Sequence, residues 1–304
     1  MKVLIVGYGV QGQKREKILK NFFYASYDNK NTKATFTDIN DIPKNKYNAV
    51  FLCVPDDQKF KLINFFIKLK KHILVEKPLI FKKISDYKNL QSQSQKNGIY
   101  IYTAYNHRFE PHFEEVKKTL KKNIIGKVYL CKIFYGNGTS KLVKKNKWRD
   151  KGLGVVQDIG PHLFDILNFW FKFKGKFTFL SKSNFENKSP DHSILTSKTK
   201  NTKFLLEMTY CMWRNTFSLE IVGSKGSISI NRLCKWGSSE FFLRKRIFPS
   251  GAPKEYSKII NINDPTWEKE HQFFFHQIKK KVKTDLSNDL YIFKTLKNLK
   301  SNLT

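Results

Sequence analysis

Residues 1–15 read MKVLIVGYGVQGQKR, and the rest of the fold is built onto this stretch. Lys2 to Val6 is a short apolar run, typical of a strand that is buried on both faces. The motif G-x-G-x-x-G follows at once, and helix-forming residues fill Gln13 to Lys20. A strand, this motif and a helix, in that order, are typical of a dinucleotide-binding fold.

Each glycine of the motif has a separate physical task. Gly7 permits the tight turn, Gly9 lets the backbone approach a pyrophosphate, and Gly12 lets the helix pack closely on the strand. Free N–H groups and the positive end of the helix would hold the phosphates. We therefore predict that the cofactor contacts the whole loop, which consists of Gly7, Tyr8, Gly9, Val10, Gln11 and Gly12.

An acidic residue about 20 positions beyond the glycines should meet the ribose hydroxyls of the cofactor. Asp28 fits, because it follows the strand-like run Phe22 to Tyr27, although it could also be an ordinary turn aspartate. A 2′-phosphate would instead suit the neighbouring side chains of Ser26, Lys30 and Lys33. NAD and NADP therefore both remain open as the cofactor.

The order of strand-like and helix-like segments indicates two domains within 304 residues. Residues 1–120 alternate strands and helices, including a short expected strand at Lys33 to Asp38, and predict an α/β, doubly wound parallel sheet (Rossmann). Residues 121–304 carry strand-like runs with few helices between them, which predicts an α+β domain with an open, mostly antiparallel sheet. Its last helices could pack back on the first domain.

The net charge is +32, from 57 Lys and Arg against 25 Asp and Glu. Such a charge attracts polyanions, but the lysines are spread along the chain and no nucleic-acid motif accompanies them. We attribute the charge to a lysine-rich composition and expect no specific nucleic-acid partner.

Other sequence features limit the class of protein. The four cysteines form no C-x-x-C pair, and no stretch reaches the ~20 apolar residues of a membrane helix. We therefore expect a cytoplasmic protein with reduced cysteines and no membrane association. His271 and His276 are five positions apart and do not share a helical face, so we predict no metal site.

Three further motifs fall where a ligand crevice is expected. They are VEKP at 75–78, YNHRF at 105–109 and GLGVVQDIGPHLFD at 152–165. The first two follow parallel strands at their carboxyl ends, where open α/β sheets bind ligands. In the third, Asp158 and His162 share one face of a helix. The alternatives are a solvated Lys77, and Asp158 as an N-cap with His162 merely exposed.

Together with VGYGVQG, these motifs resemble the glucose–fructose oxidoreductase/inositol dehydrogenase (Gfo/Idh/MocA) family. Similarity continues at Trp148-Arg149, in LEIVGSKGSIS at 219–229 and at Trp267, so the resemblance spans nearly the whole chain. It implies an NAD(P)-dependent oxidoreductase that acts on a sugar, inositol or nucleotide-linked sugar. It is specific for the family and not for a substrate.

The resemblance places the family's catalytic residues on Lys77, Asp158 and His162. A histidine that titrates near neutrality suits removal of a hydroxyl proton. Lys77 would hydrogen-bond the substrate oxygen, and Asp158 would hold a neighbouring hydroxyl or orient the pair.

The resemblance also implies further cofactor contacts from Val54, Pro55, Glu76, Lys77 and Asn106, and substrate contacts from Arg108, Trp148 and Arg149. The chain departs from the family at one point. A threonine-proline-asparagine run with a histidine is common there, whereas Cys53 to Asp57 and Lys59 stand in this sequence. That difference bears on how the cofactor is held.

Two other functions remain open for such a chain. One is glycoside cleavage with transient oxidation by the cofactor, and the other is a non-catalytic NAD(P)-dependent regulator. Retention of Lys77, Asp158 and His162 favours an enzyme. The resemblance implies a homodimer or homotetramer, and we favour surface-polysaccharide sugar metabolism as the setting.

Overall fold

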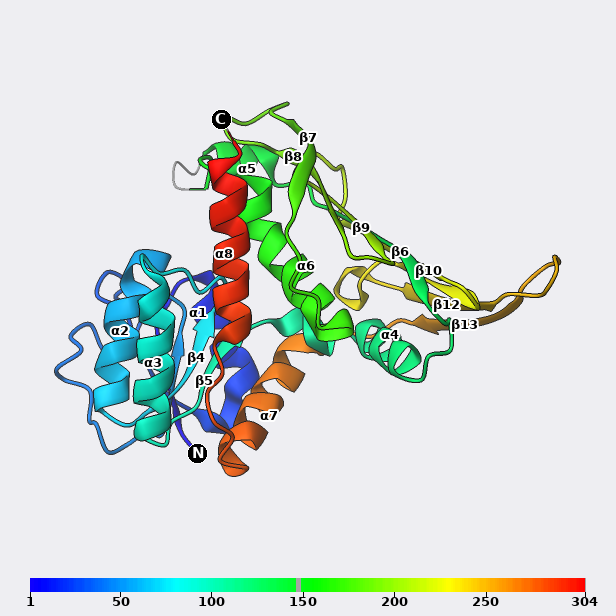
Figure 1. Ribbon diagram of the computed structural model, residues 1–304. Helices are drawn as coiled ribbons and strands as arrows, with labels where there is room; N and C mark the ends of the chain where they lie inside the picture. Colours follow the sequence, from blue (N-terminus) through cyan, green and yellow to red (C-terminus); the bar gives the residue numbers. More distant parts are fainter. Residues whose placement is uncertain (146–148, 304) are drawn as a thin grey trace. The chain divides into compact units, whose positions relative to one another are not determined.

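The structure is a computed structural model that describes residues 1–145 and 149–303 (Figure 1). Contacts between Cα atoms divide the chain into two compact units. The first comprises Met1–Asn106 and Thr266–Phe293, and the second comprises His107–Pro265 and Lys294–Thr304. The boundary that the sequence indicates, between residues 120 and 121, stays a prediction.

The first unit is built on a five-stranded parallel sheet of order β2-β1-β3-β4-β5. Because the chain steps in opposite directions from β1, the carboxyl ends of β1 and β3 form a topological switch point, where such sheets bind ligands. The strands are β1 Val3–Val6, β2 Phe23–Tyr27, β3 Ala49–Leu52, β4 His72–Glu76 and β5 Ile101–Ala104.

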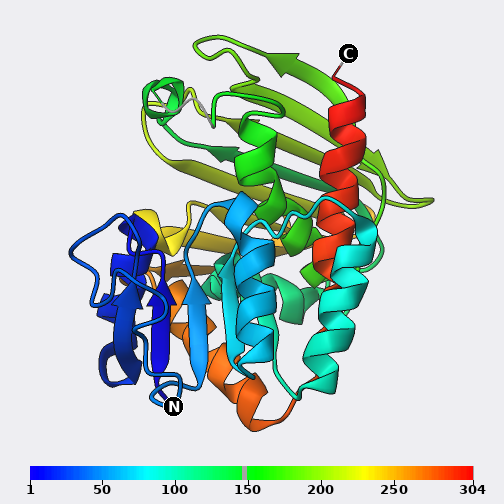
Figure 2. The same ribbon diagram turned by 90° about the vertical axis from the view of Figure 1, so that its left-hand side faces the viewer.

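Helices cover both faces of this sheet. Alternate strand residues point to opposite faces, so Leu4 and Val50 join one core while Ile5 and Phe51 join the other. The first core includes residues of α2 and α3, which cover one face of the sheet in Figure 2, and the second includes Phe274 of α7. The helices are α1 Val10–Leu19, α2 Asp56–Lys68, α3 Ile84–Lys96, α7 Thr266–Lys279 and α8 Ser287–Ser301.

The short strand expected at Lys33 to Asp38 is wrong. Only Phe36 pairs with the sheet, through an isolated bridge to Tyr27. The side chain of Thr35 accepts a hydrogen bond from the N–H of Ser26 at 3.1 Å, so polar side-chain contacts take the place of a continued ladder. The predicted α/β class with its parallel sheet is confirmed.

The second unit is built on an eight-stranded sheet of order β13-β12-β11-β10-β6-β9-β8-β7. All its neighbouring strands are antiparallel except β6 and β9. The predicted mostly antiparallel sheet is thus confirmed. The strands are β6 Val128–Gly136, β7 Thr178–Ser183, β8 His192–Lys198, β9 Lys203–Thr209, β10 Thr216–Gly223, β11 Gly226–Asn231, β12 Ser239–Lys245 and β13 Lys254–Ile260.

The helices of the second unit include the one that carries two predicted site residues. This helix, α6, begins at Val155 with Gly154 as its N-cap, so Asp158 lies in its first turn and is not the N-cap. Its apolar side buries Ile159, Leu163 and Trp170. The other helical segments are α4 Pro111–Lys121, α5 Ser140–Lys144, and the short 3-10 segments at Asn106–Phe109 and Cys234–Trp236.

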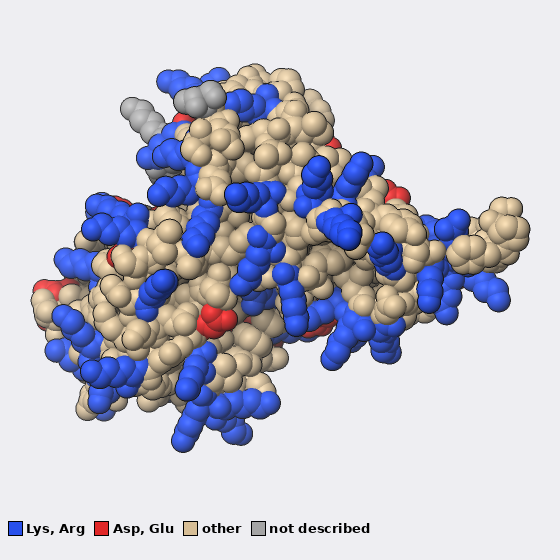
Figure 3. Space-filling view, viewed as in Figure 1, with Lys and Arg blue, Asp and Glu red and all other residues tan. Residues whose placement is uncertain are grey.

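The basic side chains are spread widely over the surface. Figure 3 shows Lys and Arg across the whole visible face, without concentration over one element. Among the helices that the structure describes, none has the length and apolar character needed to cross a membrane.

Candidate functional site

The glycine loop after β1 has the close approaches that its sequence predicts. Gly7 has φ +90°, and a Cβ there would lie 2.4 Å from the carbonyl oxygen of Cys53, at the end of β3. A Cβ on Gly12 would lie 2.2 Å from the carbonyl oxygen of Gly7. A Cβ on Gly9 would meet nothing within 4 Å. Gly7 and Gly12 therefore lie in close contact with backbone atoms, whereas the space beside Gly9 is open.

The N-terminus of α1 suits a phosphate group. Gly9 is its N-cap and makes no side-chain capping bond, and the first turn contains no acidic residue. Val10 is 83% exposed at this turn. The first N–H groups of a helix carry a partial positive charge, and an open glycine beside them gives a pyrophosphate room to approach. The loop thus fits the dinucleotide that the sequence predicts.

Asp28 lies beside this loop with an ionised carboxylate. It accepts hydrogen bonds from the backbone N–H groups of Tyr8 at 2.8 Å, Lys30 at 2.9 Å and Asn31 at 3.0 Å. Burial alone would raise the pKa of Asp28, but these three bonds outweigh it and lower the pKa. Ser26, the alternative phosphate ligand, is buried and bonded to Thr35.

The motif VEKP begins at the end of β4. The carboxylate of Glu76 accepts a hydrogen bond from Nε of Arg15 at 2.6 Å. Arg15 is buried in α1 and also contacts α7, through Glu270 Oε2 at 3.0 Å and His271 Nε2 at 2.8 Å. Burial and the charge of Arg15 lower the pKa of His271 well below its usual value, so its neutral ring accepts from the guanidinium. Sequence reasoning missed Arg15, whose acidic partners are remote in the chain.

Two further predicted cofactor residues are held within the first unit. Pro55 is the N-cap of α2, directly after Val54. Asn106 is buried, and its side-chain amide donates to Thr266 Oγ1 at 3.0 Å. Both positions follow the carboxyl ends of parallel strands, as the sequence predicts.

In the second unit, His162 packs against another histidine. Its ring centroid lies 4.0 Å from that of His107, which in turn lies 5.9 Å from the ring of Tyr135. His107 belongs to the motif YNHRF, but nothing in the sequence singled it out. The structure thus brings His107 against His162 of α6, so that two imidazoles lie together.

Asp158, one helical turn before His162, is held by two side chains. Arg149 forms an ion pair with Asp158 Oδ2, and the hydroxyl of Tyr210 donates to the same oxygen at 3.3 Å. Burial and the charge of Asp158 raise the pKa of Tyr210, so the hydroxyl keeps its proton. Arg149, predicted to line the substrate pocket, therefore contacts a predicted catalytic residue.

The other two predicted substrate residues differ in their surroundings. Arg108 donates through Nε to both carboxylate oxygens of the buried Asp165, at 3.1 and 2.9 Å. Its charge is therefore already engaged within the second unit. Trp148 lies outside the residues that the structure describes.

Lys77 belongs to the first unit, whereas Asp158 and His162 belong to the second. The predicted catalytic residues are therefore divided between the two units. That the three side chains act on one substrate stays a prediction.

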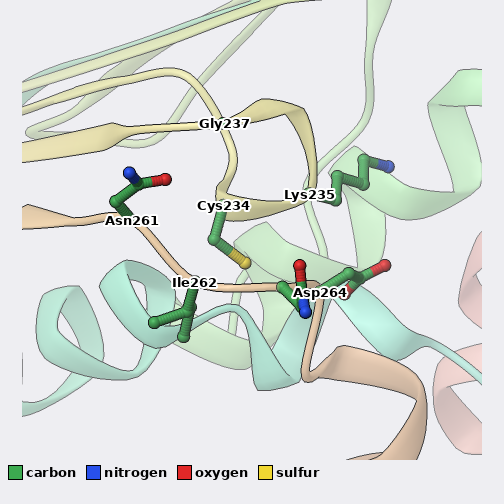
Figure 4. A pocket seen from close by; sticks show the side chains of 7 residues that line it. Cys234, Lys235, Gly237, Asn261, Ile262 and Asp264 are labelled. Atoms are coloured by element: carbon green, nitrogen blue, oxygen red, sulfur yellow. The ribbon is translucent and has the colours of Figure 1, made fainter.

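A cavity of about 480 Å³ also lies in the second unit (Figure 4). Lys235 lines it, and its ammonium donates to Tyr135 Oη at 3.1 Å. The ring centroid of Tyr135 lies 5.9 Å from that of His107. The Cys234 thiol in the same cavity donates to the buried carboxylate of Glu110 at 3.1 Å. The lining residues are Cys234, Lys235, Gly237, Asn261, Ile262, Asn263 and Asp264. Amide, ammonium and carboxylate groups together suit a ligand with many hydroxyls.

Comparison with protein-family models gives two matches. A model described as the oxidoreductase family, NAD-binding Rossmann fold, matches residues 1–105. A model described as the GFO/IDH/MocA C-terminal domain matches residues 113–229.

The curated relatives match shorter segments. An oxidoreductase named YrbE from Bacillus subtilis (strain 168), itself uncharacterised, is 31% identical over 122 residues, or 40% of this chain and 35% of that protein. A myo-inositol 2-dehydrogenase from Thermotoga maritima is 28% identical over 86 residues, or 28% of this chain and 25% of that enzyme. The matched segments therefore span about a third or less of these relatives.

A solved structure matches the whole fold. Levoglucosan dehydrogenase in complex with NADH has a TM-score of 0.80 and 16% identity, with 99% of this chain and 97% of that chain covered. At this identity the match establishes the fold alone.

Proposed function

The chain belongs to the Gfo/Idh/MocA family of NAD-binding oxidoreductases, and from that premise we propose the reaction that it catalyses. The protein transfers a hydride between a nicotinamide cofactor and a hydroxyl or keto carbon of a sugar, inositol or nucleotide-linked sugar. Relatives named myo-inositol 2-dehydrogenase and inositol 2-dehydrogenase support this class of substrate.

The proposal rests on one observation, which is the set of side-chain contacts around His162 and Asp158 within the second unit. The ring of His162 packs on that of His107, and Asp158 on the same helix is fixed by Arg149 and Tyr210. A regulator would need a pocket but would not need an acid–base pair held in this way. The arrangement supports an enzyme over a non-catalytic sensor.

The side chains divide the chemistry in a definite way. His162 removes the proton from the reacting hydroxyl in one direction and returns it in the other. Lys77 hydrogen-bonds the same oxygen and stabilises the negative charge that develops on it. Asp158 orients a neighbouring hydroxyl. When bound, the nicotinamide accepts or supplies the hydride.

Asp28 supports NAD over NADP. Its three backbone hydrogen bonds leave the ionised carboxylate with acceptor capacity for a ribose hydroxyl. The same negative charge would repel a 2′-phosphate. The alternative phosphate ligand Ser26 is already engaged with Thr35.

The wider setting is also a proposal. We place the enzyme in surface-polysaccharide sugar metabolism in the cytoplasm, as a homodimer or homotetramer. Copies would assemble through the open face of the eight-stranded sheet. Leu180 of β7 and Ile259 of β13, in its two edge strands, are exposed by 64% and 66%.

The test is an assay of the purified protein with NAD and NADP in parallel. The substrates are myo-inositol, levoglucosan, and a panel of free and nucleotide-linked sugars, and the readout is the absorbance of the reduced nicotinamide. We expect cofactor reduction with one group of these compounds, faster with NAD. Glycoside hydrolysis without net reduction would instead indicate the cleavage chemistry, and no turnover of any compound would contradict the proposal.

A further inference from the structure

A buried lysine in the first unit holds the backbone on both sides of Lys77. Lys59 lies in α2 and its side chain is 2% exposed. Its ammonium donates to the carbonyl oxygen of Glu76 at 2.6 Å and to that of Pro78 at 2.7 Å. The third partner is the carboxylate of Asp56, at 2.6 Å on the first turn of the same helix. Lys77 stands between the two carbonyls that Lys59 binds.

These three contacts use the whole bonding capacity of the ammonium, which has three donors. Burying a charged amine is costly unless each donor finds an acceptor. Burial lowers the pKa of Lys59, and the charge of Asp56 partly offsets that effect. A lysine that served only to fill space would be replaced at lower cost by an apolar side chain. The site is therefore built to bind those carbonyls.

The contacts fix the direction in which Lys77 leaves the backbone. The carbonyl of Glu76 belongs to the peptide plane before Lys77, and the carbonyl of Pro78 belongs to a plane after it. On the other side, Arg15 holds the Glu76 carboxylate at 2.6 Å. With the chain anchored before and after Lys77, its Cα–Cβ bond has little freedom to turn.

We propose that Lys59 is a positioning residue that holds the VEKP turn so that the Lys77 ammonium meets the reacting oxygen of the substrate. This inference rests on the proposed function, in which Lys77 makes that contact. Replacement of Lys59 by histidine would weaken this anchor. A neutral imidazole has one N–H donor, so it could hold one of the two carbonyls but not both. The lysine therefore gives this chain a doubly anchored turn.

The test compares three variants by turnover, cofactor affinity and hydrogen exchange. Lys59→Met removes both carbonyl contacts, and Lys59→His retains a single donor. Lys71→Met is the matched control, because Lys71 also donates to two carbonyls, those of Lys44 at 2.7 Å and Tyr47 at 2.8 Å, away from Lys77.

We expect Lys59→Met to lower kcat by about 100-fold, the scale of a misplacement of about 1 Å, while the Kd for NADH stays within about threefold. Amides of residues 75–82 should exchange faster with deuterium in this variant. Lys59→His should fall between the wild type and Lys59→Met, and Lys71→Met should retain its kcat. A purely structural role would instead weaken NADH binding in Lys59→Met by a factor similar to its loss of kcat.

A double-mutant cycle shows whether Lys59 acts through Lys77. If it does, kcat of the double variant Lys59→Met/Lys77→Met lies within about twofold of kcat of Lys77→Met alone, because the group that Lys59 positions is already absent. An independent additional loss would overturn the proposal, and so would full turnover by Lys59→Met. A wild-type protein that turns over none of the substrate panel would contradict the proposed function itself. Failure of the proposed function can thus be told apart from failure of the positioning role.

Discussion

Replacement of Arg15 by methionine should destabilise the first unit more than any surface substitution. The guanidinium is 1% exposed and joins Glu76 of β4 to Glu270 of α7, whose side chain is 0% exposed. Arg15→Met leaves these carboxylates in place without their cation. Removing one partner of a buried ion pair typically costs about 3–5 kcal/mol. We expect the free energy of unfolding to fall by that amount.

Equilibrium urea unfolding, followed by circular dichroism and extrapolated to zero denaturant, measures this loss. The matched control is Arg244→Met. Arg244 lies 2.6 Å from Glu255, but the two side chains are 34% and 42% exposed, so its loss should cost about 0–1 kcal/mol. A second variant, Arg15→Met with Glu270→Met, should recover part of the stability, because it removes the buried anion together with the cation. Equal losses for Arg15→Met and Arg244→Met would refute this reasoning.

Other predictions address pH, the cofactor loop and the cavity. The pKa of the neutral, buried His271 is well below its value in the unfolded chain. The stability that the neutral ring contributes is therefore present above pH ~6.5 and is lost as the pH falls below that value, by up to about 1.4 kcal/mol per pH unit. His271→Gln should flatten this pH dependence of the free energy of unfolding, measured in urea from pH 7 to 5. Gly12→Ala should abolish NADH binding and cost about 1–3 kcal/mol, because its Cβ would lie 2.2 Å from the Gly7 carbonyl oxygen. Gly9→Ala, in open space, should weaken NADH binding in fluorescence titrations but keep the melting temperature. Lys235→Met should raise KM for the sugar about 10–100-fold, the usual worth of a hydrogen bond to a charged group, and an unchanged KM would exclude its cavity from substrate binding.

Local patterns were sufficient for the first sheet but not for every segment near it. The apolar runs that became β1 and β3 are fully buried, so their composition alone reveals them. In Lys33 to Asp38, polar and apolar residues alternate as in a half-buried strand. Only Phe36, however, pairs with the sheet. The polar bonds of Thr35 to its neighbours stopped further pairing, and sequence patterns do not show such competition.

Two strands of the second sheet, β12 and β13, are hard to recognise in the sequence. β13 lies at the edge of the sheet, and six of its seven residues are exposed. A charged edge strand has no apolar face to reveal it in the sequence. Its neighbour β12 ends in Arg244 and Lys245, and only Ser239 and Phe241 of its residues are buried.

The contacts that order the site are the least accessible to sequence reasoning. Arg15 and Glu270 are 255 positions apart, and no local signal links them. The pairing of His107 with His162 depends in the same way on how the second unit folds. Residue types and motif positions were enough to identify the candidate residues. The side chains that contact them could be identified only from the structure.

The central claim is that His162 serves as the acid–base residue of a nicotinamide-dependent oxidoreductase. The most direct measurement compares His162→Asn with the wild type for kcat on the best substrate of the panel and for Kd of NADH, in the same preparations. We expect kcat to fall by about 10²–10⁴-fold while the Kd stays unchanged. Full turnover by His162→Asn would contradict the account.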